Sequence, residues 1–292
     1  MSAFGLANII VDGAPVLAAS FDGVLHPVHN LVDGGPSSFD EALERWDQWV
    51  EAIEVRLDAF DLPAGLDAAS ADYRPAGAAA PVLWCAGANY TDHVAEMGAT
   101  DIVKRSFHFL SPPSVRNTHG GTVVRPTGVQ QFDWEVELAA VVGRPARHVS
   151  AADALEYVAG YTVANDVSVR DPDRVRHPIF GMDWTAAKNA DGLTPVGPAV
   201  VPARFVPDPG HLDLGLTVNG VVRQKSNTSR MIVDLAEQIE ALSALVTLRP
   251  GDFVLTGTPA GTAAGHNAAY LVDGDVMVAS IATIGSLTNV VG

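Results

Sequence analysis

The chain has 292 residues, 48 % hydrophobic and 18 % charged, and its formal net charge is −16. This composition excludes an intrinsically disordered chain, and the length suits one large domain, or one large and one small domain. The acidic charge repels phosphate groups and anionic lipid, so neither nucleic acid nor a membrane is expected as a partner. The N-terminus lacks the features of a signal peptide and no apolar run is long enough to span a bilayer, so we expect a cytoplasmic protein.

Residues 1–80 are predicted to form a small N-terminal domain and linker. Two short strands are expected around AFGLANII and APVLAAS. One helix is expected over FDEALERWDQWVEAIEVRL, because apolar residues recur there at helical spacing and a serine of the preceding SSFDE can cap the first turn. The stretch SADYRPAGAAAP, rich in small residues and proline, is predicted to be the linker.

The pattern changes at residue 81 to short strands separated by glycine and proline. Asn219 and Gly220, between the alternating apolar residues of LGLTVNGVVRQ, predict a type I′ hairpin. Two helices are expected, over AADALEYVAG and over SRMIVDLAEQIEALSALV. Residues 81–292 therefore predict a catalytic domain of the α+β class, mainly β, with a rolled or sandwiched sheet. Cys85 is the single cysteine, which excludes an internal disulfide, and its apolar surroundings, VLWCAGAN, predict a packed thiol.

Residues 132–143, FDWEVELAAVVG, combine the alternation of a strand with three carboxylates. Because side chains alternate along a strand, Asp133, Glu135 and Glu137 are predicted to share one face. One interpretation is an edge strand with a solvent-exposed face. Such faces usually carry bases among the acids, and here no base occurs before Arg144. A divalent cation that neutralises the acids is therefore the favoured hypothesis.

Asp166, within GYTVANDVSVRD, is predicted to lie on an inner strand, where an unpaired carboxylate is costly. Considered alone, its expected partner is Arg170, four positions further on. Considered together with Glu135 and Glu137, it is better explained by one ion shared among three acids. Mg²⁺ and Mn²⁺ both accept such oxygen ligands, and the sequence does not choose between them.

A candidate general base lies in GANYTDHVAEMG, where His93 and Glu96 are three residues apart. On a helical turn the two side chains share a face, so the carboxylate can hold the imidazole in one tautomer for the activation of water. The flanking Gly87 and Gly98 suit a short element that moves as a lid.

Two further stretches carry candidate substrate-binding groups. Lys188, in WTAAKNADG, is predicted to bind a substrate carboxylate or oxyanion; the alternative is a solvated surface lysine. LTGTPAGT, residues 255–262, is rich in glycine but lacks the Gly-Lys-Ser/Thr ending of a P-loop. A turn that binds a carboxylate through its backbone N–H groups and threonine hydroxyls is the more plausible interpretation.

The chain resembles the fumarylacetoacetate hydrolase superfamily over about residues 81–292, in the manner of an acylpyruvase-like or 2-hydroxyhepta-2,4-diene-1,7-dioate isomerase-like member. The resemblance rests on six motifs in the same order: NYTDHVAEMG, FDWEVELAAVVGR, GYTVANDVSVRD, AAKNADGLTPVGP, LTVNGVVRQKSNTSRMI and LRPGDFVLTGTPAGT. It implies a mixed β-sandwich roll, with a small N-terminal α/β domain, and a homodimer. It also implies that Glu135, Glu137 and Asp166 hold Mg²⁺ or Mn²⁺, with Asp133 in a supporting role.

The resemblance assigns the remaining roles residue by residue. His93 and Glu96 form a water-activating dyad on a lid, and Lys188 is the matching catalytic lysine. The T-G-T-P turn brings Gly257 and Thr258 to the substrate carboxylate.

This chain departs from the pattern at several positions. Relatives often have Arg-Asp-x-Gln at the position of Arg170-Asp171-Pro172-Asp173, so Arg170 is retained as a substrate contact while the Gln is replaced by Asp173. The Ser-Phe that often follows the lysine is Asn189 and Ala190 here, and the usual Gly-Val-Gly after the turn is Gly261, Thr262 and Ala263. These departures leave the substrate side chain open.

The leading hypothesis is a metal-dependent hydrolase that cleaves a C–C bond of a 2,4-dioxo acid, of the acylpyruvate or fumarylpyruvate type, to pyruvate and a carboxylic acid. The expected partner is thus a small-molecule 2-oxo acid. The first alternative is an oxaloacetate decarboxylase, or a tautomerase or hydratase of 2-hydroxy-dienoates. The second is a metabolite-binding relative without turnover. The His93–Glu96 pair favours hydrolysis, because a decarboxylase needs no activated water.

Overall fold

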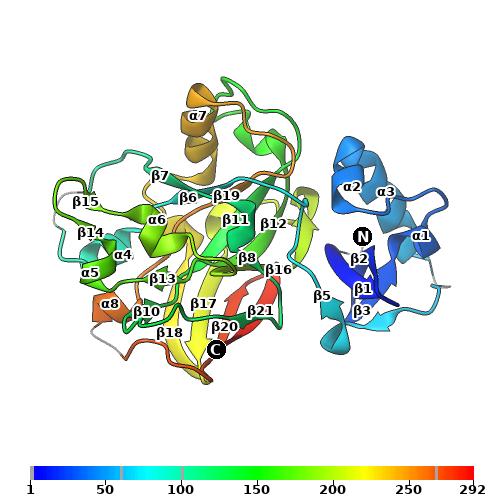
Figure 1. Cartoon of the computed structure of the whole chain (residues 1–292). Helices are drawn as coiled ribbons and strands as arrows, with labels where there is room; N and C mark the ends of the chain where they lie inside the picture. Colours follow the sequence, from blue (N-terminus) through cyan, green and yellow to red (C-terminus); the bar gives the residue numbers. More distant parts are fainter. Residues whose placement is uncertain (1–2, 60–61, 100–101, 267–268) are drawn as a thin grey trace.

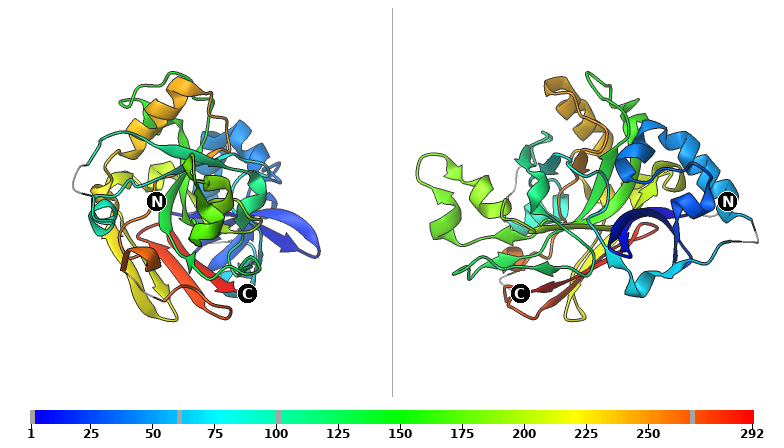
Figure 2. Two further views of the ribbon diagram at one scale, coloured as in Figure 1. Left: turned by 60° about the vertical axis from the view of Figure 1, so that its left-hand side comes forward. Right: turned by 45° about the vertical axis from the view of Figure 1, so that its right-hand side comes forward.

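Two large β-sheets and a set of short helices make up the computed structural model, which describes residues 3–59, 62–99, 102–266 and 269–292 (Figures 1 and 2). The helices are α1 Val28–Leu31, α2 Phe39–Glu44, α3 Trp46–Leu57, α4 Thr91–Glu96, α5 Pro172–Val175, α6 Trp184–Lys188, α7 Leu235–Leu245 and α8 Ala263–His266. None of the helices in these ranges has the length and apolar character needed to cross a membrane. The fold is α+β and mainly β, as the sequence predicts.

The larger sheet contains twelve strands. They are β1 Gly5–Val11, β2 Ala14–Phe21, β3 Val24–Pro27, β4 Leu66–Asp67, β5 Asp72–Tyr73, β6 Leu83–Ala86, β7 His108–Ser111, β8 Arg116–Asn117, β11 Val136–Val142, β12 Val158–Asn165, β16 Thr194–Pro202 and β19 Phe253–Leu255. Their order is β4-β3-β2-β1-β16-β12-β11-β19-β6-β7, with β5 beside β1 and β8 beside β16. Most pairs are antiparallel, but β19 with β6 and β16 with β8 are parallel, so the sheet is mixed.

The smaller sheet has the order β18-β17-β20-β21-β9. Its strands are β9 Thr122–Val123, β17 Asp213–Val218, β18 Val221–Asn227, β20 Val276–Ile281 and β21 Gly285–Val291. Asn219 and Gly220 join β17 to β18 with φ of 51° and 76°, the left-handed conformation that a type I′ turn requires at both central positions. The predicted hairpin is confirmed.

The main core lies between the two sheets. Leu138 of β11 and Val163 of β12 pack in the same buried cluster as Leu216 of β17 and Leu287 of β21. Residues one position along, such as Ala139, belong to a second cluster on the opposite face of the larger sheet. The alternating strand β11 therefore has two buried faces, and the face away from the smaller sheet is the one that carries Glu137.

The N-terminal residues continue the larger sheet. β1 pairs with β16 through Leu6 and Val200, and Figure 1 shows β1–β3 and α1–α3 grouped at one end of the molecule. Phe39 and Ile53 of this group belong to the same buried cluster as Ala139 of β11. The strands expected around AFGLANII and APVLAAS are confirmed as β1 and β2, while the division into domains at residue 80 stays a prediction.

Three helix predictions are wrong in detail. The helix expected over residues 229–246 is only α7, Leu235–Leu245. The single helix expected over residues 39–57 is two helices, α2 and α3, because Arg45 takes a non-helical conformation between them; Ser38 caps α2 by accepting a hydrogen bond from the N–H of Glu41. Residues 151–160 hold only a 3₁₀-helix, Ala154–Tyr157, and the chain enters β12 at Val158. Pairing with β11 and β16 outweighs the local helical pattern there.

Candidate metal centre

The register of two antiparallel strands brings the three predicted metal ligands together. Val136 of β11 pairs with Asn165 at the end of β12, and the N–H of Asp166 donates to the backbone oxygen of Glu135 (2.9 Å). Asp166 is therefore the neighbour of Glu135 across the two strands. Glu135 directly precedes β11, and Glu137 is the second residue of β11. The two side chains are two positions apart and so face the same side.

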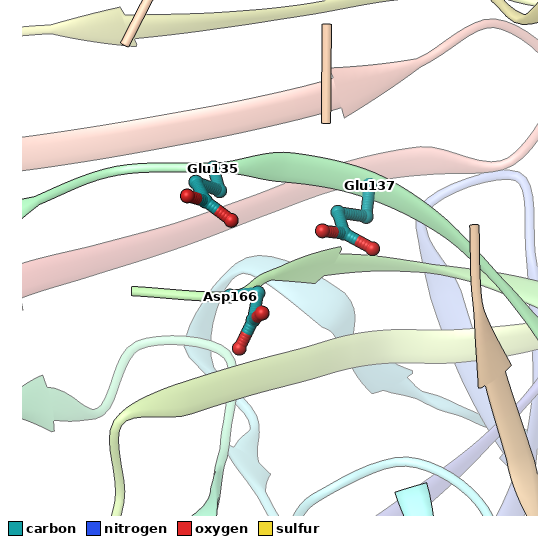
Figure 3. Close-up of side chains that lie close together, drawn as sticks. All are labelled: Glu135, Glu137 and Asp166. Atoms are coloured by element: carbon teal, nitrogen blue, oxygen red, sulfur yellow. The ribbon is translucent and has the colours of Figure 1, made fainter. Parts of the chain in front are cut away.

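The carboxylates of these residues form one buried cluster. One oxygen from each of Glu135, Glu137 and Asp166 lies within 4.8 Å of the others, and all three side chains are buried. Figure 3 shows the three side chains close together, with Glu135 and Glu137 on one stretch of chain and Asp166 on the neighbouring one. The predicted grouping of these acids is thus present in the structure, although the identity of any ion stays a prediction.

Two cations also contact the cluster. Lys188, at the end of α6, is 2 % exposed, and its Nζ donates to Glu135 Oε2 (2.7 Å), Asp166 Oδ2 (2.6 Å) and the backbone oxygen of Asp166 (2.9 Å). Arg170 forms ion pairs with Glu135 and with Asp133 (3.3 Å to Oδ2). The alternative of a solvated surface lysine is therefore wrong, and Arg170 does not make the ion pair with Asp166 considered above.

The charge balance of the cluster favours a divalent cation. Four buried carboxylates, those of Asp133, Glu135, Glu137 and Asp166, face the two cations Lys188 and Arg170. If all four carboxylates were ionised, a charge of −2 would remain uncompensated. One Mg²⁺ or Mn²⁺ ion would balance this charge. The donor set is also entirely oxygen, which suits both ions.

The pKa values reflect this balance. Burial, together with the charges of Asp166 and Glu135, raises the pKa of Glu137 well above its usual range. Burial also raises the pKa of Asp166, with the Lys188 charge acting against it. Burial acts to raise the pKa of Glu135 too, but Lys188, Arg170 and, more weakly, His93 lower it to about 2. Of the three clustered acids, Glu137 is therefore the one whose negative charge is least compensated by neighbouring groups of the protein.

His93 and Glu96 form the predicted pair on α4. The His93 Nδ1 atom lies 3.1 Å from Glu96 Oε2, and Glu96 Oε1 accepts a hydrogen bond from the N–H of Gly261 (3.0 Å). His93 is coupled electrostatically to the acidic cluster, because it helps to lower the pKa of Glu135. Because Glu96 accepts at Nδ1, the Nε2 atom of the neutral imidazole is left as the acceptor, which is the form a general base needs.

The element that carries this dyad is anchored on both sides. Asn89 donates to the backbone oxygens of Val233 and Thr256, and Asp92 accepts a hydrogen bond from Ser226 Oγ (2.6 Å). In this structure α4 therefore lies against the main fold. Its predicted movement as a lid stays a prediction.

The T-G-T-P turn contacts the acidic strand directly. The N–H of Gly257 donates to Glu137 Oε2 (2.7 Å), and the Thr258 hydroxyl donates to the backbone oxygen of Val136 (3.0 Å) and accepts from Gln224 Nε2 (2.9 Å). The sequence predicts that Gly257 and Thr258 bind a substrate carboxylate, but here their hydrogen bonds position the strand and Glu137. Their role in substrate binding stays a prediction.

Asp133 is not one of the three clustered carboxylates, although it shares Arg170 with Glu135. The strand that the sequence predicts is interrupted after Asp133: β10, Phe132–Asp133, pairs with β13, Ser168–Val169, and β11 begins at Val136. Besides its ion pair with Arg170, the Asp133 carboxylate accepts hydrogen bonds from the N–H groups of Ala263 (2.7 Å) and Ala264 (3.1 Å). Its predicted supporting role agrees with these contacts.

Three supporting residues were missed by sequence reasoning. Asn165 accepts from the N–H of Glu135 (2.8 Å), Thr194 donates to Asp166 Oδ1 (3.3 Å), and Gln224 accepts from the N–H of Val136 (2.9 Å). Each orients a candidate ligand or its strand. All three lie within the quoted motifs, but polar residues on strands give no signal of their partner.

Comparison with known proteins supplies the family. Residues 82–292 match the family model described as the C-terminal domain of fumarylacetoacetate (FAA) hydrolase. The chain belongs to the fumarylacetoacetate hydrolase family. The resemblance deduced from the six motifs is thereby confirmed, and the acidic cluster, α4 and the T-G-T-P turn all lie within the matched region.

Members of the fumarylacetoacetate hydrolase family with different activities are similar to this chain. The 4-hydroxyphenylacetate degradation bifunctional isomerase/decarboxylase of Salmonella dublin is 40 % identical over 208 residues; the match covers 71 % of this chain and 46 % of that protein, so this chain spans less than half of its length. The structure of a putative HpcE protein from Mycobacterium smegmatis has a TM-score of 0.81 at 30 % identity, with 100 % of this chain and 99 % of that chain covered.

A third member was solved with bound ligands. The structure of fumarylpyruvate hydrolase from Pseudomonas aeruginosa, in complex with Mn²⁺ and pyruvate, has a TM-score of 0.65 at 31 % identity. The match covers 72 % of this chain and 88 % of that chain. A divalent metal in a fumarylacetoacetate hydrolase fold agrees with the donor set and charge of the acidic cluster described here.

Proposed function

We propose that this protein is a metal-dependent hydrolase that cleaves a C–C bond of a 2,4-dioxo acid, of the acylpyruvate or fumarylpyruvate type, to pyruvate and a carboxylic acid. The observation that carries the proposal is the His93–Glu96 pair, together with the electrostatic coupling of His93 to the buried cluster of Glu135, Glu137 and Asp166. Mg²⁺ or Mn²⁺ held by these carboxylates supplies a Lewis acid that stabilises negative charge on the oxygens of the 2-oxo acid.

In this mechanism His93 moves the proton. Glu96 accepts a hydrogen bond from the Nδ1–H of His93. The Nε2 atom of His93 takes a proton from water while the water oxygen bonds to the C4 carbonyl carbon of the substrate. The bond between C3 and C4 then breaks, with its electron pair passing into the 2-oxo group of the pyruvate fragment. C3 finally receives a proton, so that one water is consumed and both products are acids.

Lys188 and Arg170 act on the acids rather than on water. Lys188 Nζ donates one hydrogen bond to the carboxylate of Glu135 and one to the carboxylate of Asp166, which fixes the directions of both. Its third hydrogen bond goes to the backbone oxygen of Asp166. Arg170 restrains the other oxygen of Glu135 and is itself held by Asp133. We assign to both cations the role of keeping the cluster ionised and ordered, a condition for binding any divalent ion.

A second candidate uses the same residues without hydrolysis. The name of the Salmonella relative, a bifunctional isomerase/decarboxylase, favours isomerisation or decarboxylation. In isomerisation His93 would move a proton between two carbon atoms of the substrate. No hydroxide would be transferred, so the products differ and can be told apart.

The test is an assay of purified protein with a panel of acylpyruvates, fumarylpyruvate, oxaloacetate and a 2-hydroxy-dienoate, with Mg²⁺ or Mn²⁺ and again after chelation. The proposal expects loss of the diketone absorbance, with pyruvate and a carboxylic acid formed only when metal is present. Release of CO₂ from oxaloacetate, or isomerisation of the dienoate, with unchanged acylpyruvates would replace hydrolysis by the second candidate.

His93→Ala is expected to retain metal but lose hydrolysis. The side chain is not among the acids of the cluster, so metal content should match the wild type, while kcat falls by about 10²- to 10⁴-fold, the usual contribution of a general base. The measurements are metal content by mass spectrometry and pyruvate release. His211→Ala is a matched control, because His211 also pairs with an acid three residues away but lies on the surface. Wild-type hydrolysis by His93→Ala would exclude His93 as the base.

A further inference from the structure

A cavity lies away from the acidic cluster, where the N-terminal elements meet the rest of the chain. Its volume is about 470 Å³, and its lining comes from β1, β2, the start of α2, the segment 74–79 and β8. None of the three clustered acids lines it. We infer that this cavity binds a small organic carboxylate, held by Arg74 and Arg116.

Arg116 brings a half-buried positive charge to this cavity and forms no ion pair with any residue that the structure describes. Its guanidinium donates to the backbone oxygens of Ala76 (3.1 Å) and Ala79 (2.7 Å), while its buried Nε has no hydrogen-bond partner. Burial lowers the pKa of Arg116 to about 10, with Asp40 acting in the opposite direction. The charge of Arg116 is thus met by backbone oxygens and by no ion pair, and an anion in the cavity would supply a countercharge to the guanidinium.

Arg74 adds a second charge to the same cavity. Its side chain is exposed and makes no ion pair with any residue in the part of the chain that the structure describes. Arginine is rare in this region: Arg45, Arg56 and Arg74 are the three bases of residues 1–80, which carry thirteen acids. Two arginines without carboxylate partners on one cavity are therefore notable in so acidic a chain.

The other polar groups around the cavity already have partners within the protein. Asn8 Nδ2 donates to the backbone oxygens of Pro75 and Gly77, and Ser37 Oγ donates to Glu41. Asp40, the acid that lines the cavity, accepts from the N–H of Ala79 (2.9 Å). What the two arginines lack, within the described part of the chain, is an ion-pair partner, and the ligand that suits them is an acceptor with negative charge.

The remaining walls favour a carboxylate over phosphate. They are apolar side chains from the N-terminal elements and the segment beside them: Pro15, Val16, Phe39, Pro75 and Ala78. A phosphate would lose hydration against these walls on several sides, which is costly. A carboxylate with a short alkyl group can place its charged end at the arginines and its apolar end against the walls.

The test is isothermal titration of butyrate into the full-length, metal-free protein at constant ionic strength. The expected result is saturable binding to the wild type. Arg74→Ala and Arg116→Gln should each weaken it by about tenfold or more, since each removes charge-assisted hydrogen bonds. Arg105→Ala, which removes an exposed arginine remote in sequence from the cavity lining, is the matched control and should bind as the wild type does.

Three outcomes would overturn the inference. Unchanged affinity in Arg74→Ala would do so, and this variant is expected to fold because its side chain is exposed. Loss of butyrate binding in Glu137→Gln, with Arg74→Ala unaffected, would place the carboxylate in the acidic cluster instead. Inorganic phosphate binding as tightly as butyrate, with the same dependence on both arginines, would contradict the assigned ligand class.

Discussion

Replacing Glu137 by glutamine is expected to abolish stoichiometric binding of Mn²⁺ and, with it, all turnover. Glu137 supplies one of three clustered carboxylates and is 1 % exposed, so no solvent-exposed group can take its place. Loss of a supporting group alone commonly weakens metal affinity 10- to 100-fold, and loss of a ligand should cost at least about 100-fold. The measurements are Mn²⁺ titration and metal content after gel filtration.

The glutamine variant separates metal loss from unfolding. Its amide oxygen can still accept the hydrogen bond from the N–H of Gly257, and the change removes a charge that Asp166 and Glu135 repel. The metal-free variant is therefore expected to be at least as stable as the metal-free wild type. Glu156→Gln, on an exposed acid paired with Arg144, is the control and should bind Mn²⁺ normally. Full metal content in Glu137→Gln would refute the ligand assignment.

Strand alternation accounts for what the sequence could predict of this site. Glu135 and Glu137 share a face because side chains repeat every two residues, and that holds wherever the strand lies in the sheet. The proximity of Asp166 depends on the pairing of Val136 with Asn165, a contact across about thirty residues of chain. Alternation along one strand carries no information about such a register, so the grouping of Asp166 with the two glutamates was predicted from the cost of an unpaired buried carboxylate and from the resemblance to a family.

The partners of the two cations could not be deduced from spacing. Arg170 is four positions from Asp166, which suggests a pair only if the segment is helical, whereas the chain there runs through β13. Arg170 instead reaches back across the strands to Asp133 and Glu135. Lys188 has few charged neighbours in sequence, and its burial depends on where α6 packs against the sheet. In both cases tertiary packing decided the partner.

The helix expected over residues 151–160 failed for a related reason. Alanine and leucine favour a helix locally, but Gly160 sits where a Cβ would come 2.4 Å from the backbone oxygen of Val201, so the close pairing with β16 selects glycine and extended chain. The correctly predicted hairpin at Asn219 and Gly220 needs no distant partner for its turn. Local turn chemistry was therefore readable from sequence, and strand partners were not.

Lys188→Met is expected to destabilise the metal-free protein by about 3–5 kcal/mol, because it leaves the buried carboxylates of Glu135 and Asp166 without their ammonium partner. Urea denaturation in the presence of a chelator measures this loss. Lys104→Met is the matched control: Lys104 pairs with Glu237 at the surface, and its removal should cost less than about 1 kcal/mol.

Mn²⁺ should reverse much of the loss in Lys188→Met. The Nζ of Lys188 donates to the same carboxylates that would bind the ion, Glu135 and Asp166, so a divalent ion can compensate the charge that the variant lacks. Added Mn²⁺ is therefore expected to raise the urea midpoint of the variant more than that of the wild type. An equal rise in both, or a stability loss no greater than that of Lys104→Met, would mean that Lys188 and the ion do not share these two carboxylates.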